Sequence, residues 1–157
     1  MLLNARTDEN EAYRLLQHGG QQILRSFGVA KLTDIPPSYF DWIEQLPSFL
    51  LLENYVLVHA GLNFKRPDPF ADERAMRWIR DSPVDPELIG HRVLVHGHTP
   101  IKLESIQRQL TQEPVTEINL DGGCVYSERE GQGYLVAFEL GSRALVAQKN
   151  AEKLPPD

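Results

Sequence analysis

Two stretches of the sequence decide the fold: residues 55–61, YVLVHAG, and residues 92–100, RVLVHGHTP. In each stretch a short apolar run leads directly into a histidine and small residues. Short strands that are apolar throughout are typical of sheets covered on both faces. The residues after the carboxyl ends of such strands lie at the rim of the sheet, where α/β proteins tend to keep their sites. If these two strands are neighbours in the sheet, His59 and His98 would therefore lie at the same rim.

The residue types at this rim suit a transition metal. Neutral imidazole is the commonest ligand of such ions in proteins. The small residues Ala60, Gly61 and Gly97 allow the backbone to turn sharply beside each imidazole and a ligand to come close. The alternative is that both histidines are hydrogen-bonded structural residues. Two imidazoles also fall short of a complete site, which needs three or more protein ligands.

The other elements fit an α/β protein. Apolar spacing and Gly or Pro boundaries predict helices over residues 8–27, with a break at Gly19-Gly20, and over 39–46 and 72–79. Short apolar or alternating runs predict strands over residues 48–52, 55–58, 92–95, 116–120, 134–140 and 144–148. With no repeat or linker, we expect one domain over residues 1–150 and a frayed tail over 151–157.

Composition narrows the classes of function. The chain has 157 residues, 41% hydrophobic and 24% charged, as in ordinary soluble domains. A net charge of -6 without a local basic patch argues against a nucleic-acid partner. Cys124 is the only cysteine, which excludes an internal disulfide and disfavours a thiolate metal cage. No secretory signal pattern and no apolar run of about 20 residues is present, so we expect a cytoplasmic protein without a membrane partner.

The motifs resemble a known family. VLVHAGLNF, then RWIRD, then VLVHGHTP look like the second half of calcineurin-type metallophosphoesterases, closest to the bacterial and phage serine/threonine protein phosphatases. INLDGGCVY and a closing hairpin resemble the way those enzymes end. Gly-His-Thr-Pro alone is only moderately specific, whereas three motifs in this order and spacing are far more so. The resemblance covers residues 1–148.

The resemblance implies roles for individual residues. His59 and His98 would bind the same ion of a two-metal centre, with manganese expected and iron or zinc as alternatives. Arg80 would bind the substrate phosphate, which suits the planar guanidinium fork; the alternative is a solvated arginine near a helix end. His96 would either support a metal ligand or simply be buried in its strand. Asp121 would shape a loop rather than bind metal.

The resemblance also implies what the sequence lacks. The family's Asp-x-His, Gly-Asp and Gly-Asn-His-Glu segments do not occur. We therefore expect a truncated chain, a partial version of the two-sheet αββα metallophosphoesterase sandwich, without a complete two-metal site. Its partners would be a missing N-terminal half, or a second copy paired through an exposed sheet edge.

For the function, the resemblance implies a phosphoesterase that hydrolyses phosphomonoesters on proteins or small molecules. Two alternatives stay open. One is a symmetrical dinucleoside tetraphosphate hydrolase, and the other is a non-catalytic binding module or inactive fragment.

Overall fold

A computed structural model describes residues 2–152 of the chain. The contacts within it group the chain into two compact units, Met1–Pro47 and Ser48–Asp157, and each is described by itself. The sequence predicted a single domain over residues 1–150. The expected frayed tail over residues 151–157 lies mostly outside the described residues. In the described part, no helix combines the length and the apolar character needed to cross a bilayer.

The first unit is helical. Its helices are α1 (Leu2–Ala5), α2 (Glu9–Leu15), α3 (Gln21–Phe27) and α4 (Pro37–Glu44). The predicted break between α2 and α3 is confirmed, because Gly19 has a φ of 94° inside the turn that joins them. Asp8 begins α2 by accepting hydrogen bonds from the N–H groups of Asn10 and Glu11.

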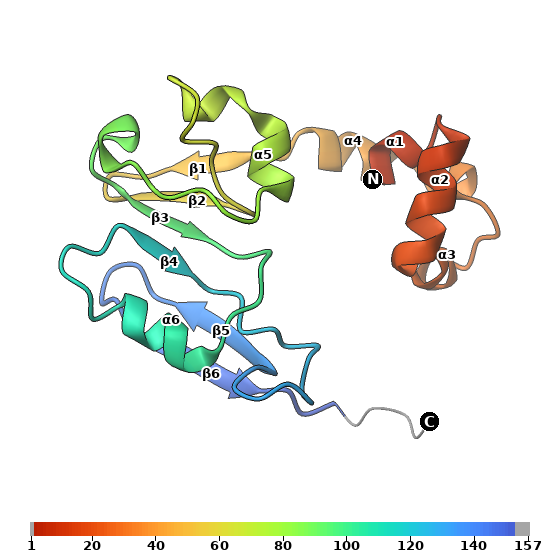
Figure 1. Cartoon of the computed structure of the whole chain (residues 1–157). Coiled ribbons are helices and arrows are strands. Elements are labelled where there is room, and N and C mark those ends of the chain that lie inside the picture. The colour runs from red at the N-terminus through yellow and green to blue at the C-terminus, as the bar shows by residue number, and fades with distance from the viewer. Residues whose placement is uncertain (1, 153–157) are drawn as a thin grey trace. The chain divides into compact units, whose positions relative to one another are not determined.

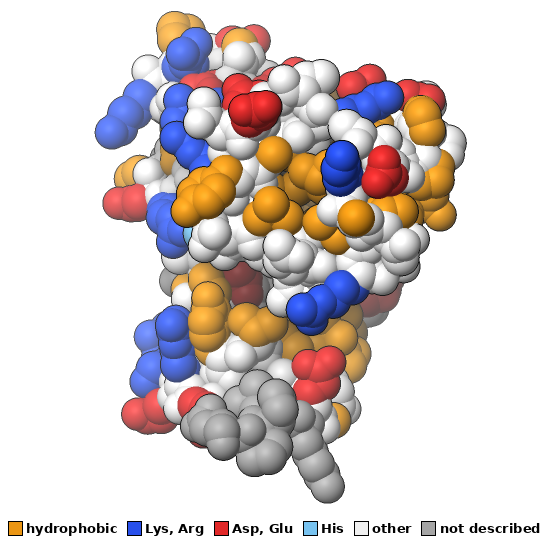
Figure 2. Space-filling model, turned by 90° about the vertical axis from the view of Figure 1, so that its right-hand side faces the viewer, with side chains coloured by type: hydrophobic (Ala, Val, Ile, Leu, Met, Phe, Trp, Pro, Cys, Tyr) orange, Lys and Arg blue, Asp and Glu red, His pale blue; other side chains and the backbone are white. Residues whose placement is uncertain are grey.

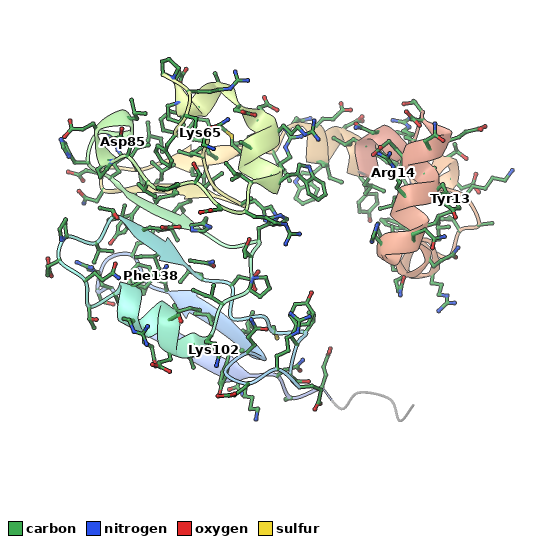
Figure 3. The ribbon with its side chains drawn as sticks, viewed as in Figure 1. Tyr13, Arg14, Lys65, Asp85, Lys102 and Phe138 are labelled. Atoms are coloured by element: carbon green, nitrogen blue, oxygen red, sulfur yellow. The ribbon has the colours of Figure 1, made fainter. Side chains whose placement is uncertain are left out.

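A small apolar core holds these helices together. Its buried members are Ala5, Leu15, Leu24, Leu32, Ile35 and Phe40. Other large side chains of the unit point to solvent, among them Tyr13 on α2 (Figure 3), which is 66% exposed. Figure 2 shows one face of the molecule, on which apolar side chains lie between charged ones. The mixture is ordinary for a folded surface, where apolar atoms make up much of the exposed area.

The second unit is built on a mixed four-stranded sheet. Its strands lie in the order β1 (Phe49–Leu51), β2 (Tyr55–Val58), β3 (Val93–His96) and β4 (Glu117–Asn119) (Figure 1). β1 and β2 are antiparallel, while β2, β3 and β4 are parallel. The predicted tight hairpin at Glu53-Asn54 is confirmed by the hydrogen bond from Leu52 N–H to Tyr55 O, at 2.9 Å.

Different elements contact the two faces of this sheet. Alternation places Val56 and Val58 on one face, in a core that includes Met76 of α5 (Glu73–Trp78). On the other face, the Tyr55 ring lies 6.4 Å from that of Phe138, which is labelled in Figure 3. Phe138 ends β5 (Tyr134–Phe138), and β5 pairs with β6 (Leu145–Lys149) in the predicted hairpin.

The helix α6 (Leu103–Gln109) was not predicted. It buries only Ile106 and carries polar or charged residues at most other positions, so its apolar periodicity is weak. The elements observed make the chain a mixed α/β protein with a four-stranded mixed sheet and a two-stranded sheet. The expected α/β class is therefore confirmed.

Candidate metal centre

The two histidines predicted to share a rim do lie together. His59 directly follows β2, and His98 follows the next strand of the sheet, β3, after Gly97. The parallel register pairs Leu57 with Val95, and the Gly97 N–H continues the pairing by donating to His59 O at 2.9 Å. As a result His59 Nε2 and His98 Nδ1 are 3.1 Å apart. In the neutral pair, one ring nitrogen donates its proton and the other accepts it.

The separation of these nitrogens also suits a shared ion. Two nitrogens each about 2.0–2.1 Å from one metal, and 3.1 Å from each other, subtend an angle of about 95–102° at the metal. That angle is close to the one between neighbouring ligands of a six-coordinate ion. The other ring nitrogen of His98, Nε2, points away from this pair; it is buried and has no hydrogen-bond partner among the described residues. A buried polar atom without a partner is uncommon and calls for an explanation.

The backbone of His98 is held in an unusual conformation. Its φ is 70°, in the left-handed region that non-glycine residues rarely adopt, although His is among those that do so more often. Such residues cluster at functional sites, where the surrounding structure supports the strain. The Trp78 ring packs edge-on against the imidazole, with 5.9 Å between the ring centres. Trp78 itself is 52% exposed, so this edge of the site is open to solvent.

The electrostatic environment favours the neutral form of His98. Burial lowers the pKa of this imidazole, and the nearby His59 and Arg80 lower it further, while Asp121 acts in the opposite direction. Neutral imidazole is the form whose lone pair can bind a metal. Arg80 is thus near enough to influence His98, so the fold brings together the three residues singled out from the sequence.

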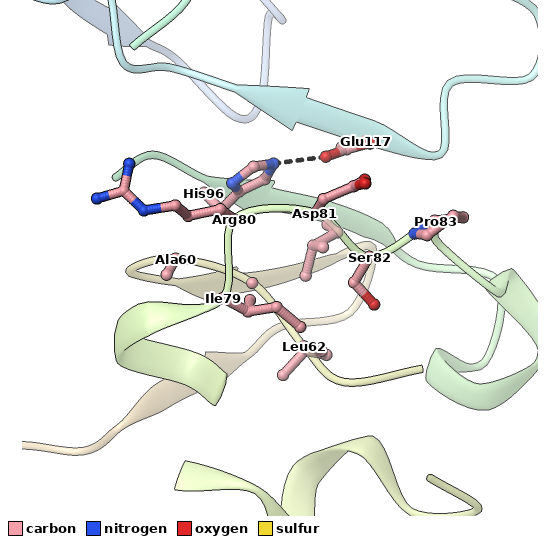
Figure 4. A pocket seen from close by; sticks show the side chains of 11 residues that line it. Ala60, Leu62, Ile79, Arg80, Asp81, Ser82, Pro83, His96 and Glu117 are labelled. Atoms are coloured by element: carbon pink, nitrogen blue, oxygen red, sulfur yellow. Dashed lines mark hydrogen bonds and ion pairs between the residues drawn. The ribbon is translucent and has the colours of Figure 1, made fainter. Parts of the chain in front are cut away.

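Arg80 lies beyond the end of α5 and is exposed. It lines a small pocket of about 100 Å³ with Asp81, Ser82, His96 and Glu117. In Figure 4 its side chain extends past His96, on the side away from Ser82. Within residues 2–152 no carboxylate forms an ion pair with Arg80, which leaves its fork available to an anion.

His96 is largely buried in β3 and ion-paired. Its Nε2 is 2.6 Å from Glu117 Oε1 on β4, and its side chain is 10% exposed (Figure 4). Its Nδ1 lies 3.2 Å from the Gly97 carbonyl, in the loop that carries His98. The structural interpretation of His96 therefore has a clear physical basis, and its role in supporting a metal ligand stays a prediction.

Sequence reasoning missed the polar residues of β4. Asn119 is 5% exposed and donates through Nδ2 to Thr99 O, next to His98, while its Oδ1 accepts from the Asp121 N–H. Asp121 in turn accepts from the Gly123 N–H, which is the loop-shaping role expected for it. The signal available was the alternation of Glu117 and Asn119 with apolar residues. Only the pairing of β4 with β3 shows that they serve the His98 loop.

The donor set at this rim is incomplete. In the part of the chain that the structure describes, no three His, Cys, Asp or Glu side chains are grouped so as to hold a metal ion. His59 and His98 therefore fit two positions around an ion, and the remaining positions need solvent, a substrate or another chain. No protein-family model, curated protein or solved structure matches this chain.

Proposed function

We propose that this chain carries part of a metal-dependent phosphoesterase site of the serine/threonine protein phosphatase kind. The observation that carries the proposal is the 3.1 Å approach of His59 Nε2 to His98 Nδ1 at the carboxyl ends of two parallel strands. The substrate would be a phosphomonoester on a protein or a small molecule. The ion would be a divalent metal, with manganese first and iron or zinc as alternatives.

Each residue has a role that its surroundings support. His59 and His98 would hold the ion, and the strained loop of His98 fixes the direction of its ring before the ion arrives. The Arg80 guanidinium would bind two phosphate oxygens in its planar fork. When bound, a divalent ion would neutralise phosphate charge and make a water molecule a better nucleophile. Trp78 would pack against the His98 imidazole and hold its orientation, while this edge of the site stays open to solvent.

The proposal also includes the fold of the second unit. The four-stranded sheet and the β5–β6 hairpin would be parts of the two sheets of an αββα sandwich. The contact of Tyr55 with Phe138 supports this arrangement, as does the hydrogen bond from the Tyr55 hydroxyl to Leu140 O at 3.0 Å. Both join the two sheets through side chains rather than through a strand ladder.

A second candidate is a non-catalytic metal-binding or phosphate-binding module. The observation that favours it is the absence of a third grouped ligand within residues 2–152. A two-metal reaction requires ligands for both ions, and two imidazoles supply only part of one set. The two candidates share the ion and the phosphate, and differ in whether the chain alone turns over a substrate.

The test measures Mn²⁺ binding by electron paramagnetic resonance and hydrolysis of p-nitrophenyl phosphate on the same samples. His59→Ala and His98→Ala are expected to weaken Mn²⁺ binding by about tenfold or more, since even loss of a group that only supports a ligand has effects of that size. His91→Ala is a matched control, because His91 is exposed and also has a positive φ, of 56°. It should bind Mn²⁺ like the unmodified chain.

The outcomes separate the two candidates. Hydrolysis above background that disappears in His98→Ala supports the phosphoesterase. Mn²⁺ binding that depends on both histidines, without hydrolysis, supports the non-catalytic module. Equal Mn²⁺ binding by the unmodified chain and His98→Ala would contradict both and leave the histidines with a structural role.

A further inference from the structure

The outer edge of the four-stranded sheet has an open hydrogen-bonding row. β1 is the first strand in the sheet order and pairs only with β2 (Figure 1). The Leu52–Tyr55 hydrogen bond fixes which residues of β1 point at β2, because hydrogen-bonded and non-hydrogen-bonded pairs alternate along an antiparallel ladder. Leu50 therefore directs its N–H and C=O toward β2. Phe49 and Leu51 direct theirs outward.

Nothing in the described part of the chain uses these outward groups. No turn, loop or cap hydrogen bond involves the N–H or C=O of Phe49 or Leu51. The side chains along the edge are also partly bare, since Leu50 is 49%, Leu51 54% and Leu52 39% exposed. Natural sheets usually protect such an edge with a charge, a proline or a bulge within the strand. Residues 48–52, SFLLL, contain none of these protections.

The geometry points to a second copy of this chain as the occupant: β1 pairs with β1 of the second copy, antiparallel, about a twofold axis at Leu50. In this register Phe49 lies opposite Leu51 of the second copy, so every outward N–H of these two residues meets an outward carbonyl. Leu50 lies opposite Leu50 of the second copy as a non-hydrogen-bonded pair, in which side chains are closest. Because the surface is self-complementary, the pairing closes at two chains.

Charges at the ends of the strand match this register. Ser48 would lie opposite Leu52 of the second copy, next to its Glu53. Arg77 of α5 is ion-paired with Glu73, and its Nη2 also lies 3.5 Å from Ser48 Oγ. In the dimer its guanidinium would therefore lie beside Glu53 of the second copy, on the sheet face to which alternation assigns Glu53. Within residues 2–152, Glu53 forms no ion pair. The twofold axis repeats this Arg77–Glu53 approach at both ends of the joined strands.

The test is sedimentation velocity of the full chain from about 1 μM to 1 mM, a range that spans weak association. We expect the mass to rise toward twice that of the chain. Leu51→Pro removes an outward N–H and no bond to β2, and should leave a monomer whose circular dichroism is unchanged. Leu135→Lys is the matched control, a leucine of β5 that is 65% exposed, and should still dimerise.

A charge pair tests the register itself. Leu50→Lys and Leu50→Glu should each be monomeric, because like charges meet at the twofold axis. Mixed in equal amounts, they should form a heterodimer. A monomeric unmodified chain up to 1 mM would overturn the inference, as would a folded Leu51→Pro that still dimerises. Failure of the mixed variants to associate, with the unmodified chain dimeric, would overturn β1–β1 pairing about Leu50.

Discussion

The sequence Val-Leu-Val-His occurs at both β2 and β3, but the loops that follow these strands, which carry His59 and His98, have unequal surroundings. His59 follows a Val-Leu-Val run in an exposed loop that is anchored to α5 by the hydrogen bond from Ala60 N–H to Met76 O, at 2.8 Å. His98 is half-buried, with a positive φ and a ring nitrogen, Nε2, that has no hydrogen-bond partner among residues 2–152. The strand sequence therefore determines where each histidine lies in the sheet, whereas the elements packed around each loop determine the exposure and the backbone conformation of that histidine.

The largest effect is expected where the His98 loop meets β4. Asn119→Ala removes the donation to Thr99 O and the acceptance from the Asp121 N–H. We expect a loss of about 2–4 kcal/mol in the free energy of unfolding, because two partly buried groups lose their partners. Urea denaturation measures the loss, and NMR should show the ring signals of His98 shifting more than those of His59. A change confined to His59 would reverse the assignment of Asn119 to the His98 loop.

The next largest effect on stability is expected from an alanine substitution in the His59 loop, at Gly61, with Gly97 in the His98 loop as its control. A Cβ at Gly61, where φ is 149°, would lie 2.9 Å from Ile79 Cγ2, so Gly61→Ala should lower the free energy of unfolding by about 1–3 kcal/mol. At Gly97 a Cβ would lie 3.5 Å from Asp121 Cβ, an ordinary contact. Gly97→Ala should change the free energy by about 0.5 kcal/mol or less. Denaturation midpoints that rank the two variants the other way would contradict this account.

The smallest expected effect is a pH dependence of stability that arises at Asp72, at the start of helix α5, which anchors the His59 loop. Asp72 caps α5, and its pKa is lowered mainly by the Asn63 side-chain hydrogen bond, then by the Ala75 N–H and by Arg66. A lowered pKa in the folded state stabilises the protein above the unfolded-state pKa, near 3.8. That stabilisation is lost as the pH falls through the lower, folded-state value.

The matching measurement compares Asp72→Asn with the unmodified chain in urea at several pH values. The variant should unfold at lower urea near neutral pH, and the difference should shrink as the pH falls below about 4. At low pH the protection of the Ala60 amide against hydrogen exchange, relative to its intrinsic exchange rate, should fall more than that of the Gly97 amide. A difference that grows on acidification would show that Asp72 is protonated more readily in the folded chain, against its assigned hydrogen bonds.

The sequence predicted the strands and most helices, because apolar runs and Gly, Pro or Asp boundaries are local signals. It also predicted that His59 and His98 lie at one rim of the sheet, because parallel strands align their carboxyl ends. It did not reveal α6, whose single buried residue leaves little periodicity. Nor did it reveal the pairing of His96 with Glu117 or the role of Asn119. Both depend on the register between β3 and β4, which residues far apart in the chain determine.

The hydrogen bond from Gly97 N–H to His59 O allows opening of the site to be measured at a single backbone amide. The bond lies past the last paired residues of β2 and β3, and directly joins the two loops that carry the imidazoles. The bond sets the spacing of the two backbones at this point, and the side-chain torsions of His59 and His98 then set the spacing of the rings. Hydrogen exchange at this single amide then reports how often the pair comes apart, separately from opening of the rest of the sheet.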